Sequence, residues 1–139
     1  MIRRANKFDT QDIIRLLKEF AEQSEIALGY DPLTWSKTRI EAILAKIFAG
    51  SGVILINEEK TALLVAVINQ AFWVEQYQLV EVMLHANNRL TMVKLIKEYV
   101  TIATEMKAEG RISKALISSH KQANFEKLGF RQLETSWEL

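Results

Sequence analysis

A single glutamate interrupts one of the most apolar stretches of the sequence. Glu81 stands between Val80 and Val82, inside the apolar segment 79–84, in a region that reads as a β-strand from 77 to 84. A buried carboxylate is costly unless it is hydrogen-bonded, paired with a cation or kept for chemistry. Three interpretations therefore stay open: a proton-accepting group in a reaction, the partner of an arginine, or a glutamate on the more exposed face of its strand.

Metal and thiol chemistry find little support in the remaining side chains. His85 follows the same expected strand, but the chain has only two histidines and no cysteine. A zinc site would need carboxylate ligands as well, and no such spacing is present. The lack of cysteine also excludes disulfides and thiol catalysis.

The elements that would position Glu81 are helices, in which apolar residues recur at helical spacing, and strands, which form short apolar or alternating runs. Asp9 or Thr10 is expected to cap the first helix with a side-chain oxygen. The pattern predicts strands at 2–4, 53–56, 63–68, 77–84, 114–118 and 130–138, and helices from about 10 to 23, 34 to 48, 89 to 109 and 121 to 128.

This order of elements predicts a mixed α/β sheet. Three consecutive strands joined by short turns should be antiparallel, and the unit from 77 to 118 should be a parallel, right-handed crossover. Helices would then cover both faces of the sheet. We expect one domain over residues 1–139, since no linker or repeat interrupts the pattern.

Composition narrows the class of protein. Apolar residues make up 49% and charged residues 25%, with 18 basic and 17 acidic side chains and a net charge of +1. That balance gives no electrostatic case for binding nucleic acid. No apolar run approaches the length of a membrane span, and the N-terminus lacks a signal peptide. We expect a cytoplasmic protein, or one inside a virion assembled in the cytoplasm.

Three stretches resemble the GNAT superfamily of N-acetyltransferases. The opening 2–5, followed by Asp9 and a helix, is similar to the family's first strand and helix. The strand 80–84 leads through Asn88 into a long helix, where the family keeps its acetyl-CoA pyrophosphate loop. The most specific match is Phe125-Glu126-Lys127-Leu128-Gly129-Phe130, which is similar to the family's YEKLGF ending. In detail, 68–89 and 129–135 look most like GNAT-type proteins of tailed bacteriophages.

The resemblance implies that acetyl-CoA binds where the fourth strand meets the long helix. In the family, a loop of pattern R/Q-x-x-G-x-G/A presents helix N-terminal amides to the pyrophosphate, and its glycines let the phosphates come close. The corresponding residues here are Arg89, Leu90, Thr91, Met92, Val93 and Lys94. Arg89 matches the first position, whereas Met92 and Lys94 replace the glycines. The Met92 side chain would crowd the cradle, and Lys94 could meet the phosphate charge or face solvent. Backbone groups near Met83 and Leu84 correspond to those that hold the pantetheine.

The reaction implied by the resemblance is acetyl transfer to an amine, which needs a base and often an acid. Many family members place a glutamate on the fourth strand as the base, which here is Glu81. Phe125 takes the place of the family's tyrosine acid, and Ser118 that of its asparagine at the end of the fifth strand. Both stand at cofactor-binding positions of the family. His120 could donate the proton instead, or it could cap a helix or face solvent.

Two functions therefore remain open. The leading interpretation is an acetyl-CoA-dependent N-acetyltransferase that acts on an unknown amine, either a small molecule or a protein. The alternative is a catalytically silent GNAT fold that binds a protein or serves as a structural part, for example in a phage particle or against a host protein. The departures at Met92, Lys94 and Phe125 favour the alternative.

Overall fold

The fold is built on a five-stranded sheet with the strand order β1-β2-β3-β4-β5. The computed structural model describes residues 1–23, 35–118, 125–133 and 139. The strands are β1 (Ile2–Arg4), β2 (Gly52–Asn57), β3 (Leu63–Gln70), β4 (Tyr77–His85) and β5 (Lys114–Leu116). Neighbours from β1 to β4 run antiparallel, and β4 pairs with β5 in parallel. This confirms the predicted mixed, mostly antiparallel sheet.

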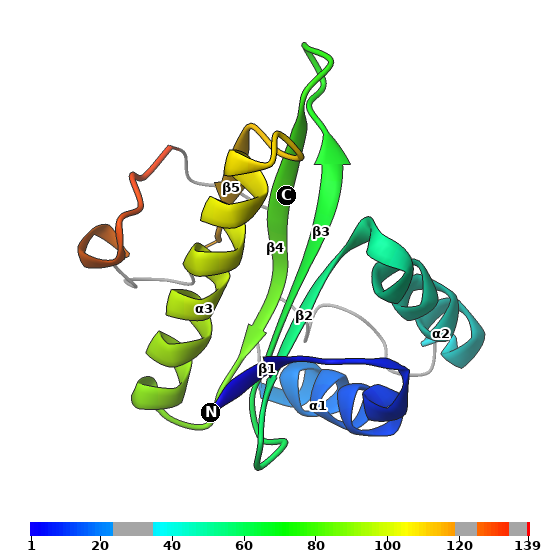
Figure 1. The fold of residues 1–139 in the computed structure, drawn as a ribbon. Helices are drawn as coiled ribbons and strands as arrows, with labels where there is room; N and C mark the ends of the chain where they lie inside the picture. The colour runs from blue at the N-terminus through cyan, green and yellow to red at the C-terminus, as the bar shows by residue number, and fades with distance from the viewer. Residues whose placement is uncertain (24–34, 119–124, 134–138) are drawn as a thin grey trace.

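Helices cover both faces of the sheet, as predicted (Figure 1). The long helices are α1 (Thr10–Gln23), α2 (Lys37–Lys46) and α3 (Arg89–Ala108), and the short turns are η1 (Lys7–Asp9), η4 (Ile47–Ser51) and η5 (Glu126–Leu128). Side chains of α3 pack on one face with Leu55, Leu64 and Leu79. Side chains of α1 and α2 pack on the other face with Ile54 and Met83. No helix in the described ranges is long and apolar enough to cross a membrane.

The first helix begins differently from the prediction. Asn6, rather than Asp9 or Thr10, caps the turn that leads into α1, because its side chain accepts from the amide of Phe8. The carboxylate of Asp9 instead accepts two hydrogen bonds of 2.8 Å from the Arg3 guanidinium and one from the Asn6 amide. Together these bonds lower the pKa of Asp9 to about 2, and those from Arg3 have the largest effect. Asp9 thus links η1, the turn before α1, to β1.

The second helix is shorter than predicted. Ser36 caps it by accepting from the Arg39 amide at 3.1 Å, so that α2 begins at Lys37. The chain then continues through η4, a π-helical turn in which Gly50 takes a positive φ of 117°. The predicted start at 34 lies outside the described residues.

The C-terminal segment departs most from the prediction. β5 ends at Leu116 instead of continuing to 118, and 130–133 is irregular rather than strand. Of the predicted last helix, only η5 is described, and it is a 3₁₀ turn. Gly129 follows it at a φ of 95°, and the Phe130 ring packs edge-on against Phe125 at 6.2 Å. This local turn takes the place of the expected helix end. The remainder of both elements lies outside the described residues.

Candidate active site

A β-bulge in β4 determines which way its side chains point. Val65 of β3 is opposite Met83, but the next residue, Ala66, is opposite Glu81, so that Val82 is the extra residue. Leu79 belongs to the α3 side of the core, whereas Met83 belongs to the α1 and α2 side. The bulge therefore reverses the alternation of β4 immediately after Glu81.

The pairing between β4 and β5 stops at the same place. It runs from Gln78 opposite Lys114 to Val80 opposite Leu116, while β4 continues to His85. Within the described ranges, residues 81–85 have no partner strand on the β5 side. An unpaired strand edge offers N–H and C=O groups to an extended chain. Met83 and Leu84, the predicted pantetheine positions, lie in this stretch.

Glu81 occupies the point where the two strands separate. Its side chain is only 6% exposed, and its Oε2 accepts from the backbone amide of Ser118 at 3.2 Å. No arginine pairs with Glu81 in the part of the chain that the structure describes, and the residue is buried, so the ion-pair and exposed-face interpretations are both wrong. Burial raises the pKa of Glu81 to about 7, while the Ser118 amide acts in the opposite direction. The carboxyl group is thus poised to gain or lose a proton near neutral pH.

Sequence reasoning missed the residue that holds β4 and β5 together next to Glu81. The hydroxyl of Tyr99 in α3 lies 2.7 Å from the carbonyl oxygen of Leu116 and 3.1 Å from that of Leu79. Burial first, and then the Glu81 carboxylate, raise the pKa of this hydroxyl. The sequence places Tyr99 only in an apolar helical stripe. A fully buried tyrosine needs a hydrogen-bond partner for its hydroxyl. A tyrosine in an apolar helical stripe could therefore have indicated a buried polar contact at this position.

Replacing Tyr99 by phenylalanine should destabilise the protein by about 1–2 kcal/mol, because two strand carbonyls lose a buried donor. Thermal unfolding measures the change. Tyr77→Phe is the matched control, since Tyr77 is 52% exposed and the substitution should stay within about 0.5 kcal/mol of the parent. Equal melting temperatures for the two variants would show that the Tyr99 hydroxyl does not tie the strands together.

The N-terminus of α3, where the sequence predicts the pyrophosphate site, leaves some of its backbone amides without a partner in the described part of the chain. Helix α3 begins at Arg89, so the six loop positions are already helical. The side-chain oxygen of Asn88 accepts from the Thr91 amide at 2.8 Å, and the backbone carbonyl oxygen of Asn88 accepts from the Met92 amide at 3.2 Å. The amides of Arg89 and Leu90 take part in no hydrogen bond within the described residues. An incoming phosphate would therefore find two amides free and compete with Asn88 for a third.

The other predicted site residues divide into three groups. Ser118 is beside Glu81, but it contributes its backbone amide rather than its side chain. Phe125 contacts Phe130 in the C-terminal turn, and His120 lies outside the described residues. His85 is buried at the end of β4, where its Nε2 is 3.4 Å from Oε2 of Glu19. No group of three or more acidic or histidine side chains in the described ranges could hold a metal ion.

Comparison with solved structures identifies the fold. No protein-family model and no curated protein matches the sequence. An acetyltransferase from Trypanosoma brucei superposes with a TM-score of 0.68 at 16% identity, over 100% of this chain and 97% of that one. Glucosamine-6-phosphate N-acetyltransferase from Arabidopsis thaliana gives 0.68 at 16% identity, over 100% and 96%. A candidate acetyltransferase from Agrobacterium tumefaciens gives 0.69 at 14% identity, over 100% and 98%.

Proposed function

We propose that this chain, which has the GNAT fold, is an acetyl-CoA-dependent N-acetyltransferase of one domain. One observation carries the proposal. Glu81 is a buried carboxyl group with a pKa of about 7. It lies where β4 separates from β5, and from this point on the backbone edge of β4 is free within the described residues. A structural role alone would not require a carboxylate there, because the Ser118 amide could be satisfied by a neutral acceptor.

Glu81 would act as the general base. Acetyl-CoA would supply the acetyl group as a thioester, and the acceptor amine must lose a proton before it can attack. Oε2 of Glu81 is held by Ser118, and the carboxylate accepts no other hydrogen bond within the described residues. Its second oxygen is therefore available to take the proton, directly or through a water molecule. A base works best when its pKa lies near the working pH, and about 7 meets that condition.

The residues present fit an acetyl-CoA site in outline. The amides of Arg89 and Leu90, with the Arg89 guanidinium and the exposed Lys94, would hold the phosphates at the N-terminus of α3. The free edge at Met83 and Leu84 would hold the pantetheine. The acceptor would be an amine on a small molecule or a protein. The Arabidopsis relative is named for an amino-sugar phosphate, so amino sugars belong in the first panel of acceptors.

Replacing Arg89 by alanine should raise the KM for acetyl-CoA about tenfold or more, because a charge-assisted phosphate contact is lost. The assay follows release of the CoA thiol during acetylation of a panel of amines and peptides. Arg39→Ala is the matched control: it removes the same charge from the exposed surface of α2 and should change nothing. Identical KM values for the two variants would remove Arg89 from the cofactor site.

The second candidate is a catalytically silent GNAT fold that binds a protein or builds an assembly. The Asn88 cap favours it, because it uses the Thr91 amide that a phosphate would need. Met92 favours it as well, because a methionine in place of the family's glycine would crowd the phosphate. Phe125 favours it as well, since it cannot donate a proton. A protein that acetylates none of the panel and releases no CoA above the background rate would establish this candidate in place of the first.

A further inference from the structure

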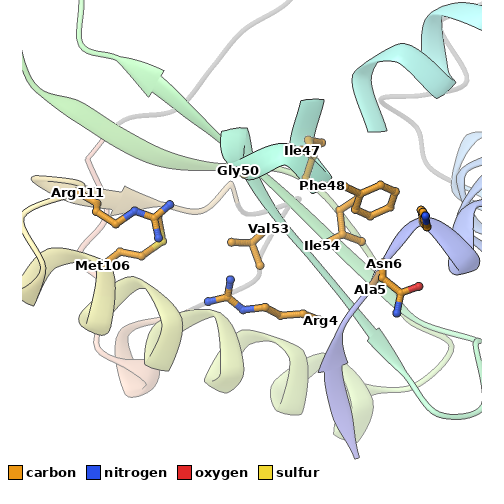
Figure 2. A pocket seen from close by; sticks show the side chains of 12 residues that line it. Arg4, Ala5, Asn6, Ile47, Phe48, Gly50, Val53, Ile54, Met106 and Arg111 are labelled. Carbon is orange, nitrogen blue, oxygen red and sulfur yellow. The ribbon is translucent and has the colours of Figure 1, made fainter. Parts of the chain in front are cut away.

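The cavity at the β1 edge of the sheet lies apart from Glu81. It has a volume of about 370 Å³ and opens between the start of the chain, η4, β2 and the end of α3 (Figure 2). β1 pairs with β2 only as far as Arg4 opposite Leu55, and the amide of Ala5 then donates to the carbonyl oxygen of Ile54. The cavity lies where β2 continues beyond this pairing, at Gly52 and Val53.

Every charged side chain that lines this cavity is a cation. They are Arg4, Lys7 and Arg111, and no aspartate or glutamate is among the lining residues that the structure describes. The ammonium group of Lys7 lies 5.3 Å from the centroid of the Phe8 ring, so Arg4 and Arg111 are the two cations left for a ligand. Figure 2 shows the guanidinium groups of Arg4 and Arg111 turned toward the same space beside Val53. The two guanidinium groups that face this space form a site for an anion, and guanidinium groups suit the oxygens of phosphate or carboxylate.

The two neighbouring arginines of β1 have different tasks. The charge of Arg3 is paired with Asp9, which it contacts through two hydrogen bonds of 2.8 Å. Arg4 points to the opposite face of the strand, and no acidic side chain within the described residues pairs with it. Its charge is thus available to a ligand.

The end of α3 fixes the position of Arg111. Gly110 takes a positive φ of 75°, the Gly110 amide donates to Lys107, and the Arg111 amide donates to Met106 at 2.9 Å. This pair of bonds is a Schellman motif, which reverses the chain and satisfies the last helix carbonyls. The only acidic contact of Arg111 within the described residues is Glu109 at 3.9 Å, an exposed pair of little strength that a ligand could displace.

The rest of the lining is largely apolar. Ile47 and Phe48 of η4 belong to the α1 and α2 side of the core, whereas Val53 and Met106 belong to the α3 side and lie beside the two guanidinium groups. A ligand that carried an apolar group next to its anionic head could therefore use both parts of the cavity, and burial of the apolar part would add to its affinity.

We propose that this cavity binds a small phosphate monoester, with the phosphate held between Arg4 and Arg111 and a compact apolar group against Val53 and Met106. A dianion suits a site with two guanidinium groups better than a monoanion does. The site lies at the C-terminal end of α3, whereas Arg89 begins that helix. Twenty residues at about 1.5 Å each separate the two ends by roughly 30 Å. This inference does not depend on the proposed acetyltransferase activity.

The experiment is an NMR titration of the whole chain with phenyl phosphate, inorganic phosphate and benzoate. Phenyl phosphate should shift the backbone amides of Val53 and Arg111 in a saturable way, and it should bind more tightly than either of the other two probes. Arg4→Ala and Arg111→Ala should each weaken it about tenfold or more. Arg39→Ala, which removes a charge outside the cavity, and Arg89→Ala, which alters the other end of α3, should leave its affinity unchanged.

Three results would overturn the proposal. Shifts that cluster at Arg89 and Leu90 would place the phosphate at the N-terminus of α3. An equal loss of affinity in Arg39→Ala and Arg4→Ala would show attraction to charge without a site. Benzoate that binds as tightly as phenyl phosphate would exclude the phosphate class. Circular dichroism and melting curves verify that each variant is folded, so a loss of binding cannot be a loss of structure.

Discussion

Replacing Glu81 by glutamine is expected to lower the rate of acetyl transfer by about 10²–10⁴-fold, the usual contribution of a general base. Glutamine keeps the shape of the side chain and an oxygen that can accept from the Ser118 amide, so the fold and the affinity for acetyl-CoA should persist. The lost rate should partly return as the pH rises, because more of the acceptor amine is then already neutral. CoA release measured over a range of pH tests all of this.

Glu75→Gln is the matched control for that measurement. Glu75 is exposed in the turn between β3 and β4, so the same chemical change there should leave turnover at the parent level. An undiminished rate in Glu81→Gln would remove Glu81 from the mechanism, whatever its effect on stability. The buried carboxyl group would then need another explanation.

The second large effect is on stability and concerns pH. The pKa of Glu81 is about 7 in the folded chain, against 4.5 for a glutamate exposed to water as in the unfolded chain, so the folded state binds more protons between these values. The contribution of Glu81 to stability is therefore fully present below the unfolded-state pKa of 4.5, and it is lost as the pH rises through the folded-state pKa of about 7. The difference corresponds to about 3 kcal/mol of unfolding free energy at most. Glu81→Gln should lack this loss and be the more stable protein at pH 8.

Urea unfolding at pH 5 and pH 8 measures the effect. Asp9 does not confuse it, because a pKa lowered to about 2 alters stability only in more acidic solution. Glu75→Gln should keep the parent's dependence on pH. If Glu81→Gln loses stability between pH 5 and pH 8 as steeply as the parent, burial does not raise the pKa of Glu81 as described.

The sequence predicted the architecture because long, regular hydrophobic patterns define it. The strands near 53, 63 and 77 and the helix that begins at Arg89 carry a period that tertiary contacts do not override. The short elements were less predictable. The positive φ of Gly129 and the contact of Phe130 with Phe125 determine the turn before 130–133. Neither feature can be predicted from the spacing of apolar residues.

The candidate site was predictable only in part. Glu81 was found because a carboxylate in an apolar strand is conspicuous. The bulge at Val82 could not be predicted, because it depends on the register of β4 with β3. The role of the Tyr99 hydroxyl could not be predicted either, because its partners are carbonyl groups of two other segments. Arg4 and Arg111 are far apart in sequence, so only the folded chain brings their charges to one cavity.

Calorimetric titration of the protein with acetyl-CoA tests the proposed function at its first step, the binding of the cofactor. We expect saturable binding at a single site, weakened about tenfold or more in Arg89→Ala and unaffected in Arg39→Ala. Binding should survive in Glu81→Gln, because in the proposed mechanism Glu81 takes the proton of the acceptor amine and does not contact the cofactor. The absence of any binding heat at millimolar acetyl-CoA, at two temperatures and with a folded protein, would contradict the enzyme proposal.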